Sequence, residues 1–172
     1  MEFVILVDEQ DNAIGTMEKQ QAHVEGVLHR AFSIFIFNSK KELLLQKRAS
    51  TKYHCGGMWT NTCCSHPREN ESVVDAANRR LQEEMGMQSS LKPIFTFVYK
   101  AEFANGLTEH EFDHVYFGES NEMPSINNEE VEDFRFIGMK ELQLEIKESP
   151  NNFTPWFLIA LDRVNEFNAL QS

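Results

Sequence analysis

A seven-residue segment that is apolar at all but one position places the tightest constraint on how this chain can fold. The segment runs Ala31-Phe-Ser-Ile-Phe-Ile-Phe37, whereas a strand with one solvated face would alternate apolar and polar side chains. A strand that is apolar on both faces belongs in the centre of a sheet that is covered on both sides. The segment therefore predicts a layered protein with this strand in its middle.

Four further segments have the composition of strands, and the last two flank an Asn-Gly turn of the kind found in hairpins. They are Phe3 to Val7, Leu43 to Arg48, Ile94 to Phe103 and Thr108 to Gly118. Ser72 to Asp75 resembles a helix capping box, and Gly86 can end the apolar stripe that follows it. Thr154-Pro155 opens a second helix that reaches about Leu170. This order predicts an α/β fold, a mixed β-sheet sandwiched between helices.

Composition restricts the class of protein. A length of 172 residues with 41% hydrophobic content suits a single packed domain. The net charge of −11 argues against a general nucleic-acid binder, although it does not exclude a small anionic substrate. The sequence has no run of about 18 apolar residues, so we expect no membrane span. The start shows no secretory signal and the three cysteines suit a reducing compartment, so we expect a cytoplasmic protein.

The densest chemistry lies between Trp59 and Pro67, which read Trp-Thr-Asn-Thr-Cys-Cys-Ser-His-Pro. In an extended segment successive side chains alternate faces, so Cys64 and His66 are expected to point one way and Cys63 the other. A thiol and an imidazole are thereby delivered to one wall. Taken alone, a cysteine is more often a small buried apolar residue than a reactive group.

The helix that follows this segment carries several charges. They are Glu71, Arg79, Arg80, Glu83 and Glu84. One interpretation is that Arg79 with Glu83, and Arg80 with Glu84, form ordinary surface pairs four residues apart, worth a few tenths of a kcal/mol each. The other interpretation is that the carboxylates bind a metal ion.

Three histidines and two glutamates form a second group of possible ligands. They are His23, His29, His66, Glu109 and Glu111. Glu109 and Glu111 share one face of a strand because side chains alternate, and imidazoles with carboxylates suit Zn²⁺, Mn²⁺ or Mg²⁺. Each of these residues alone reads as an ordinary core or surface residue. His54, His110 and His114 are also present, so the number of histidines does not by itself identify which of them bind a metal ion.

Basic and aromatic side chains accompany these groups. Arg48 and Lys52 flank the segment that leads into Trp59 and would suit phosphate oxygens. Lys19 reads equally well as a solvated charge. Tyr99 and Trp156 are by default core aromatic residues.

Together these motifs resemble a known family. The stretch from Glu71 to Met87 resembles the Nudix box, a loop–helix–loop that holds a divalent metal against a diphosphate, with Ser65 where the box begins with Gly and Arg80 where it has Glu. A wider set of motifs resembles the type I isopentenyl-diphosphate isomerases, which have the Nudix fold and interconvert isopentenyl and dimethylallyl diphosphate. These motifs are His23 with His29, residues 47–52 and 59–67, Arg79 to Gly86, Tyr99, residues 106–111 and residues 154–156. The isomerases also have Arg at position 80, and the resemblance extends from about residue 2 to 165.

The resemblance implies a single Nudix-like domain over residues 1–172, with a motif-bearing core at about 28–165. It implies an acid–base pair of Cys64 and Glu111 on the two sides of the isoprenoid chain, with Tyr99 against Glu111. It implies one divalent ion (Mn²⁺, Zn²⁺ or Mg²⁺) on His23, His29, His66, Glu109 and Glu111, and a Mg²⁺ ion held on the diphosphate by Glu84 and the backbone carbonyl of Cys64. It implies substrate binding by Lys19, Arg48, Lys52, Arg80 and Trp156, with Trp156 and Trp59 offering aromatic faces to a cation.

Two other functions compete with the isomerase. A Nudix hydrolase of nucleoside diphosphate derivatives would require the Glu that Arg80 replaces, and it has no use for Cys64. A non-catalytic metal-binding or sensor module would explain the histidines, but not the Nudix-like helix segment or the basic residues. For the isomerase we expect a small isoprenoid diphosphate as partner, no nucleic acid or membrane, and a monomer or weak homodimer.

Overall fold

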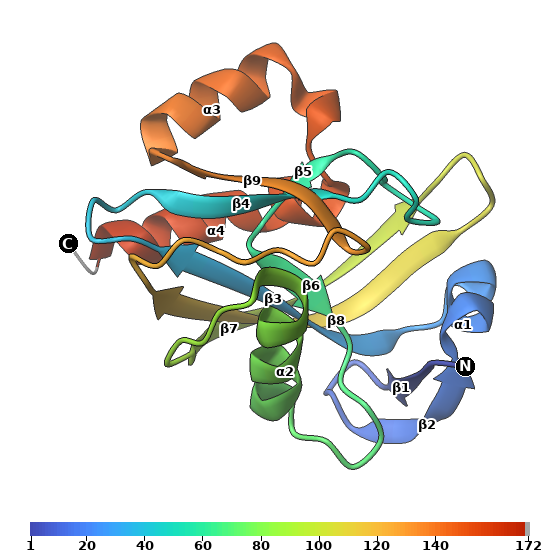
Figure 1. Ribbon diagram of the computed structural model, residues 1–172. Helices are drawn as coiled ribbons and strands as arrows, with labels where there is room; N and C mark the ends of the chain where they lie inside the picture. The colour runs from blue at the N-terminus through green and yellow to red at the C-terminus, as the bar shows by residue number, and fades with distance from the viewer. Residues whose placement is uncertain (171–172) are drawn as a thin grey trace.

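The computed structural model describes residues 1–170, and within them the strands form one nine-stranded mixed sheet (Figure 1). The strands are β1 (Phe3–Val7), β2 (Ala13–Glu18), β3 (His29–Phe37), β4 (Leu43–Arg48), β5 (Trp59–Thr60), β6 (Cys63–Ser65), β7 (Lys92–Glu102), β8 (Thr108–Glu119) and β9 (Val131–Ile137). The helices are α1 (Lys19–Glu25), α2 (Val73–Met85), α3 (Met139–Glu148) and α4 (Pro155–Leu170), with a 3₁₀ turn at Pro150–Asn152. No helix within residues 1–170 is long and apolar enough to cross a membrane.

Strand β3 is the centre of the sheet, as its composition predicts. It pairs in parallel with β8 along its whole length, from His29 opposite Glu111 to Phe37 opposite Glu119. Its alternate side chains enter two different cores. Phe32, Ile34 and Ile36 pack with α2, whereas Phe35 and Phe37 pack with α4. Both faces of the strand are therefore covered by helices, which confirms the sandwich expected from the sequence.

On its other side β3 separates from β4, and the two strands pair only at Phe37 and Leu43. The segment from β5 to β6 runs through the opening, where β5 pairs with β4 and β6 pairs with β3 (Figure 1). Thr62 connects the two sides, because its Oγ1 donates a hydrogen bond to the carbonyl of Leu44 (2.6 Å) and accepts one from the N–H of Ile36 (2.9 Å). The cysteine-bearing segment is thus fixed to both halves of the sheet.

Helix α2 has the ends that its sequence predicts. The Ser72 hydroxyl accepts a hydrogen bond from the N–H of Asp75 (3.2 Å), which satisfies one of the free donors of the first turn. The helix ends at Gly86 in the left-handed region (φ 62°), which glycine adopts without strain. A Cβ atom there would lie 2.5 Å from the carbonyl oxygen of Ser125. Glycine is therefore required both by the helix end and by the loop packed on it.

Four elements were not anticipated: β2, β9, α1 and α3. Strand β2 lies at the edge of the sheet and is largely exposed, so its sequence does not alternate in polarity. Helix α1 has only seven residues, too few for a visible apolar stripe. Strand β7 also begins at Lys92, two residues before the expected Ile94.

We predict that Thr62→Val destabilises the protein by about 1–3 kcal/mol, although the two side chains have nearly the same shape. The substitution leaves the N–H of Ile36 and the carbonyl of Leu44 buried without this partner. Urea denaturation measures the effect, with Thr16→Val on an exposed strand position as the control. Equal stability of the two variants would contradict the role given to Thr62.

Candidate functional site

Five side chains converge on one point between α1 and the sheet. The ligand atoms of His23, His29, His66, Glu109 and Glu111 all lie within 4.8 Å of one another. His29 and Glu111 meet because they are partners in the β3–β8 register, and Glu109 shares the Glu111 face of β8. His23 comes from α1, whose short length is fixed by a Glu18 side-chain cap and by Gly26 in the left-handed region.

The imidazoles are oriented to present their Nε2 atoms. The Nδ1 atoms of His23 and His29 lie 2.6 and 2.8 Å from the carbonyl oxygens of Lys19 and Val27. A carbonyl only accepts, so Nδ1 carries the proton and Nε2 keeps a lone pair. Both Nε2 atoms and Glu109 Oε2 are buried without a hydrogen-bond partner, and the Nε2 atoms lie 3.2 and 3.5 Å from Oε1 of Glu109 and Glu111. Unpaired buried polar atoms are costly, and this set of donors fits a divalent cation.

The charges within the cluster are strongly perturbed. Burial lowers the pKa of His66 to about 4 and outweighs the opposing effect of Glu111, so this imidazole is neutral at pH 7, as a metal ligand must be. Burial acts to raise the pKa of Glu111, but contacts with Glu109, His29 and His66 hold it well below the usual range. Burial also lowers the pKa of His23, but Glu109 and the Lys19 carbonyl produce a net rise.

A tyrosine and a thiol adjoin this cluster. The Tyr99 hydroxyl donates to Glu111 Oε2 (2.7 Å), while Glu111 Oε1 lies 3.0 Å from His66 Nε2. Tyr99, Glu111, Cys64 and Trp156 line one cavity of about 40 Å³. Burial raises the pKa of the Cys64 thiol far above its ordinary value, so the thiol retains its proton at neutral pH. The cavity therefore brings together a protonated thiol and an ionised carboxylate.

The adjacent cysteines face opposite sides of the sheet. Cys64 packs with the core beneath α4, whereas Cys63 is fully buried in the core beneath α2. This is the alternation expected of an extended segment. The Cys63 thiol contacts Glu84 Oε2 (3.3 Å), so the two cysteines serve different parts of the site.

Glu84 is the centre of a second polar cluster on the α2 side. It is 4% exposed, and its Oε1 accepts from Arg80 (2.6 Å) while its Oε2 accepts from Gln46 (3.0 Å). Arg80 also contacts Glu83 (2.6 Å) and Glu130 (3.4 Å). Lys52 pairs with Glu130, and Lys19 pairs with Glu2 (2.9 Å). Three of the cations expected to bind phosphate are thus held by carboxylates in this structure.

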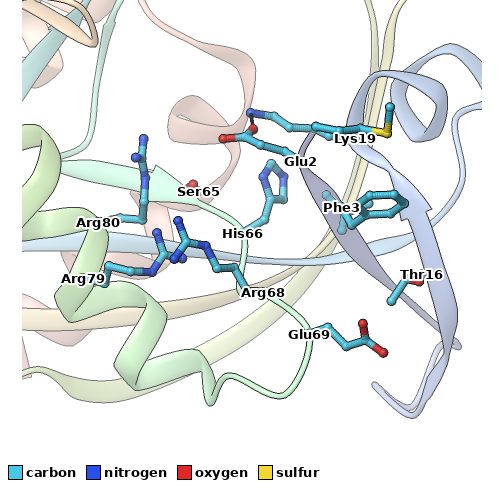
Figure 2. A pocket seen from close by; sticks show the side chains of 12 residues that line it. Glu2, Phe3, Thr16, Lys19, Ser65, His66, Arg68, Glu69, Arg79 and Arg80 are labelled. Carbon is cyan, nitrogen blue, oxygen red and sulfur yellow. Dashed lines mark hydrogen bonds and ion pairs between the residues drawn. The ribbon is translucent and has the colours of Figure 1, made fainter.

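A wider cavity of about 470 Å³ adjoins the narrow one and shares Lys19, Ser65, His66 and Arg80 with it. Figure 2 shows Arg68, Arg79 and Arg80 on one side of this space, with the Glu2–Lys19 pair across from them. The wider cavity therefore presents several cations next to the narrow one.

The two tryptophans have different surroundings. Trp156 lines the narrow cavity, and the Arg48 guanidinium carbon lies 5.2 Å from the centre of its ring. Trp59 lines neither cavity, and its ring is covered by Arg135 at 4.4 Å. The aromatic face expected from Trp59 is therefore not offered to the site.

Sequence reasoning missed four polar residues of the site, which are Gln46, Tyr53, His54 and Glu130. Gln46 and Glu130 contact Glu84 and Arg80 of α2, and Tyr53 and His54 line the narrow cavity. Gln46 follows three leucines on β4 and is 2% exposed, and an amide that is buried in this way signals a specific partner. Tyr53 and His54 lie in a loop, where no periodicity reveals the direction of a side chain.

A family match and two similar proteins indicate the same family for this chain. Residues 27–157 match the NUDIX domain. The chain is 52% identical over 161 residues to isopentenyl-diphosphate Delta-isomerase 2 of Aromatoleum aromaticum, which covers 94% of this chain and 85% of that protein. It is 49% identical over 164 residues to isopentenyl-diphosphate Delta-isomerase of Pectobacterium atrosepticum, covering 95% and 92% of the two chains.

Solved structures share the fold at low identity. A Deinococcus radiodurans protein aligns with a TM-score of 0.72 at 20% identity, covering 86% of this chain and 90% of that one. A MutT protein from Methanosarcina mazei aligns with a TM-score of 0.65 at 17% identity, covering 82% and 95%. Likeness at this identity establishes the architecture alone.

We predict that His29→Ala loses a divalent ion that the unsubstituted protein retains, because the substitution removes a preoriented nitrogen ligand. Metal analysis after dialysis measures the retained ion. Glu84→Gln is the matched control, since Glu84 belongs to the separate α2-side cluster. Loss of the ion from the Glu84 variant but not from the His29 variant would contradict the assignment.

Proposed function

The chain belongs to the NUDIX family and, within it, to the isopentenyl-diphosphate Delta-isomerases, and we propose that it interconverts isopentenyl and dimethylallyl diphosphate by a 1,3-allylic proton shift. The observation that carries the proposal is the narrow cavity, where the half-buried Cys64 thiol and the buried Glu111 carboxylate accompany an aromatic ring. Identity of about half over nearly the full length of both chains supports the same reaction.

The reaction imposes strict demands on its site. Protonation of an unactivated alkene creates tertiary cationic character, while a second proton must leave a neighbouring carbon. Water must be excluded, because it would capture the cation. A hydrolase has the opposite need, since it must bring water to the diphosphate.

The acid–base pair that we propose is Cys64 and Glu111. Because the reaction is reversible, each group donates a proton in one direction and accepts one in the other. Both groups line the narrow cavity, together with Tyr99 and Trp156. The hydrogen bond from Tyr99 fixes one oxygen of Glu111, so the carboxylate keeps a defined orientation toward the substrate.

Metal binding is proposed at two places. A divalent ion (Mn²⁺, Zn²⁺ or Mg²⁺) bound by the three histidines with Glu109 and Glu111 supplies fixed positive charge that orients the catalytic carboxylate. Glu84 and the backbone carbonyl of Cys64 would hold a Mg²⁺ ion on the diphosphate. The buried, hydrogen-bonded position of Glu84 supports this second role.

Lys19, Arg48, Lys52 and Arg80 are proposed to bind the diphosphate, with the hydrocarbon tail against Trp156. All five line the narrow cavity or its mouth. The carboxylates that pair with Lys19, Lys52 and Arg80 must release them for this purpose. An indole face stabilises a cation by about 2 kcal/mol or more in a dry site, and binding energy from the diphosphate orients the short tail.

A NUDIX hydrolase is the less supported alternative. Arg80 occupies the position of a metal-binding carboxylate and makes a 2.6 Å ion pair with Glu84. A site with fewer carboxylates for metal is poorly suited to activating water. Cys64, which lines the same cavity as Glu111, has no use in that reaction.

The setting that we propose is the cytoplasm, without nucleic acid or membrane, for a monomer or weak homodimer. Three cysteines that are free in the described structure support a reducing compartment. The net charge of −11 supports a protein that does not bind nucleic acid.

The function is tested by incubating the purified protein with isopentenyl diphosphate and, separately, with a panel of nucleoside diphosphate derivatives. We expect conversion to dimethylallyl diphosphate without release of phosphate or pyrophosphate. Nucleotide hydrolysis without any isomerisation would move the protein to the hydrolase function.

We predict that Cys64→Ala lowers isomerase turnover by at least about a hundred-fold, the usual loss when a general acid or base is removed. Cys63→Ala is the matched control, since its thiol faces α2 and not the narrow cavity. The measurement is the steady-state turnover of isopentenyl diphosphate by each of the two variants. An inactive Cys63 variant beside an active Cys64 variant would contradict the assignment of faces.

A further inference from the structure

His54 is a buried histidine that has no role in the function described above. It lies in the loop between β4 and β5 and is 7% exposed. It lines the same narrow cavity as Cys64 and Glu111. Both ring nitrogens of a buried imidazole need hydrogen-bond partners, so those partners show which nitrogen donates and which accepts.

Both ring nitrogens of His54 have charged partners. Arg48 Nη2 lies 3.2 Å from His54 Nδ1 and 3.3 Å from the His54 carbonyl oxygen. A guanidinium only donates, so Nδ1 accepts and the ring proton lies on Nε2. Nε2 in turn contacts Glu109 Oε1. The contacts therefore fix one neutral tautomer, which accepts from Arg48 and donates to Glu109.

His54 lies outside the group of five metal-binding side chains. Its nitrogens are not among the ligand atoms that lie within 4.8 Å of one another. Its Nε2–H is already directed at Glu109 Oε1, which leaves Glu109 Oε2 buried without a partner. This arrangement is that of a hydrogen-bond donor behind a carboxylate ligand, not of a sixth ligand.

The His54 ring is held in place by aromatic rings from three parts of the chain. Tyr53 stacks on it with centroids 4.5 Å apart, and Phe103 and Trp156 lie at 5.2 and 5.8 Å. A donor that is held this firmly loses little entropy when it orients a carboxylate. It also lies between the diphosphate-binding and metal-binding parts of the cavity.

We propose that His54 is a positioning residue that orients Glu109 for the metal ion and Arg48 for the diphosphate, and so couples the two parts of the site. The proposal rests on the function given above. Removal of such a partner of a metal-binding carboxylate typically costs about 10–100-fold in metal affinity or activity. Through Arg48, loss of the imidazole also weakens binding of the diphosphate.

The test compares His54→Phe, which keeps an aromatic ring, with His54→Gln, whose amide keeps an N–H donor for Glu109. His114→Gln is the matched control, because His114 contacts a carboxylate, Asp11, away from the site. Mn²⁺ binding without substrate is measured from the paramagnetic resonance of free Mn²⁺, and unfolding temperature is measured in parallel. At saturating Mn²⁺, KM and kcat for isopentenyl diphosphate are then determined.

For His54→Phe we expect Mn²⁺ affinity to fall about 10–100-fold and KM to rise even at saturating Mn²⁺. His54→Gln is expected to bind Mn²⁺ more tightly than the Phe variant, and His114→Gln to match the unsubstituted protein. Unchanged Mn²⁺ affinity in the Phe variant would overturn the proposal, as would equal losses in the Phe and Gln variants at equal unfolding temperature. Since Mn²⁺ binding needs no substrate, these results are distinct from failure of the isomerase activity itself.

Discussion

The parallel pairing of β3 with β8 is the contact on which the site depends. Its register sets His29 opposite Glu111, and strand alternation then places Glu109 on the same face. Both strands are covered by helices, so these polar side chains are buried in a cavity that side chains fill almost completely. Burial raises the pKa of the Cys64 thiol and lowers that of the His66 imidazole. The same pairing thus brings together the carboxylates and one of the imidazoles that could hold a metal ion.

The opening between β3 and β4 supplies the second half of the site. The segment through it is tied to both strands by Thr62, and its neighbouring cysteines serve opposite sides. Cys64 faces the carboxylate of β8, whereas Cys63 contacts Glu84 on α2. One short extended segment therefore joins the proposed acid–base cavity to Glu84, the carboxylate proposed to bind the metal ion of the diphosphate. Arg48 and His54 form a second connection, from the β4 end of the same opening.

The sequence predicted the parts of the fold that have a clear pattern. The segment 31–37, apolar at all but one position, predicted the central layer, and the Ser72 cap and Gly86 predicted the ends of α2. Edge strand β2 and short helix α1 were missed because exposure and length remove their periodicity. Spacing and family resemblance together suggested the five-residue cluster, but not the hydrogen bonds of Gln46 and His54. Those contacts depend on a single buried amide and on the conformation of a loop, and no repeating pattern of polarity in the sequence predicts either of them. Trp59 failed as a site residue because Arg135, distant in sequence, covers its ring.

The central claim is that two different groups, Cys64 and Glu111, exchange protons with the substrate. Conversion of isopentenyl diphosphate in heavy water tests it most directly, with the deuterium content of the dimethylallyl diphosphate measured at low conversion. Thiol and carboxyl protons exchange with solvent, so the account predicts deuterium in the newly formed methyl group. A product without deuterium would mean that one group carried the same proton from carbon to carbon, and it would contradict the two-group mechanism.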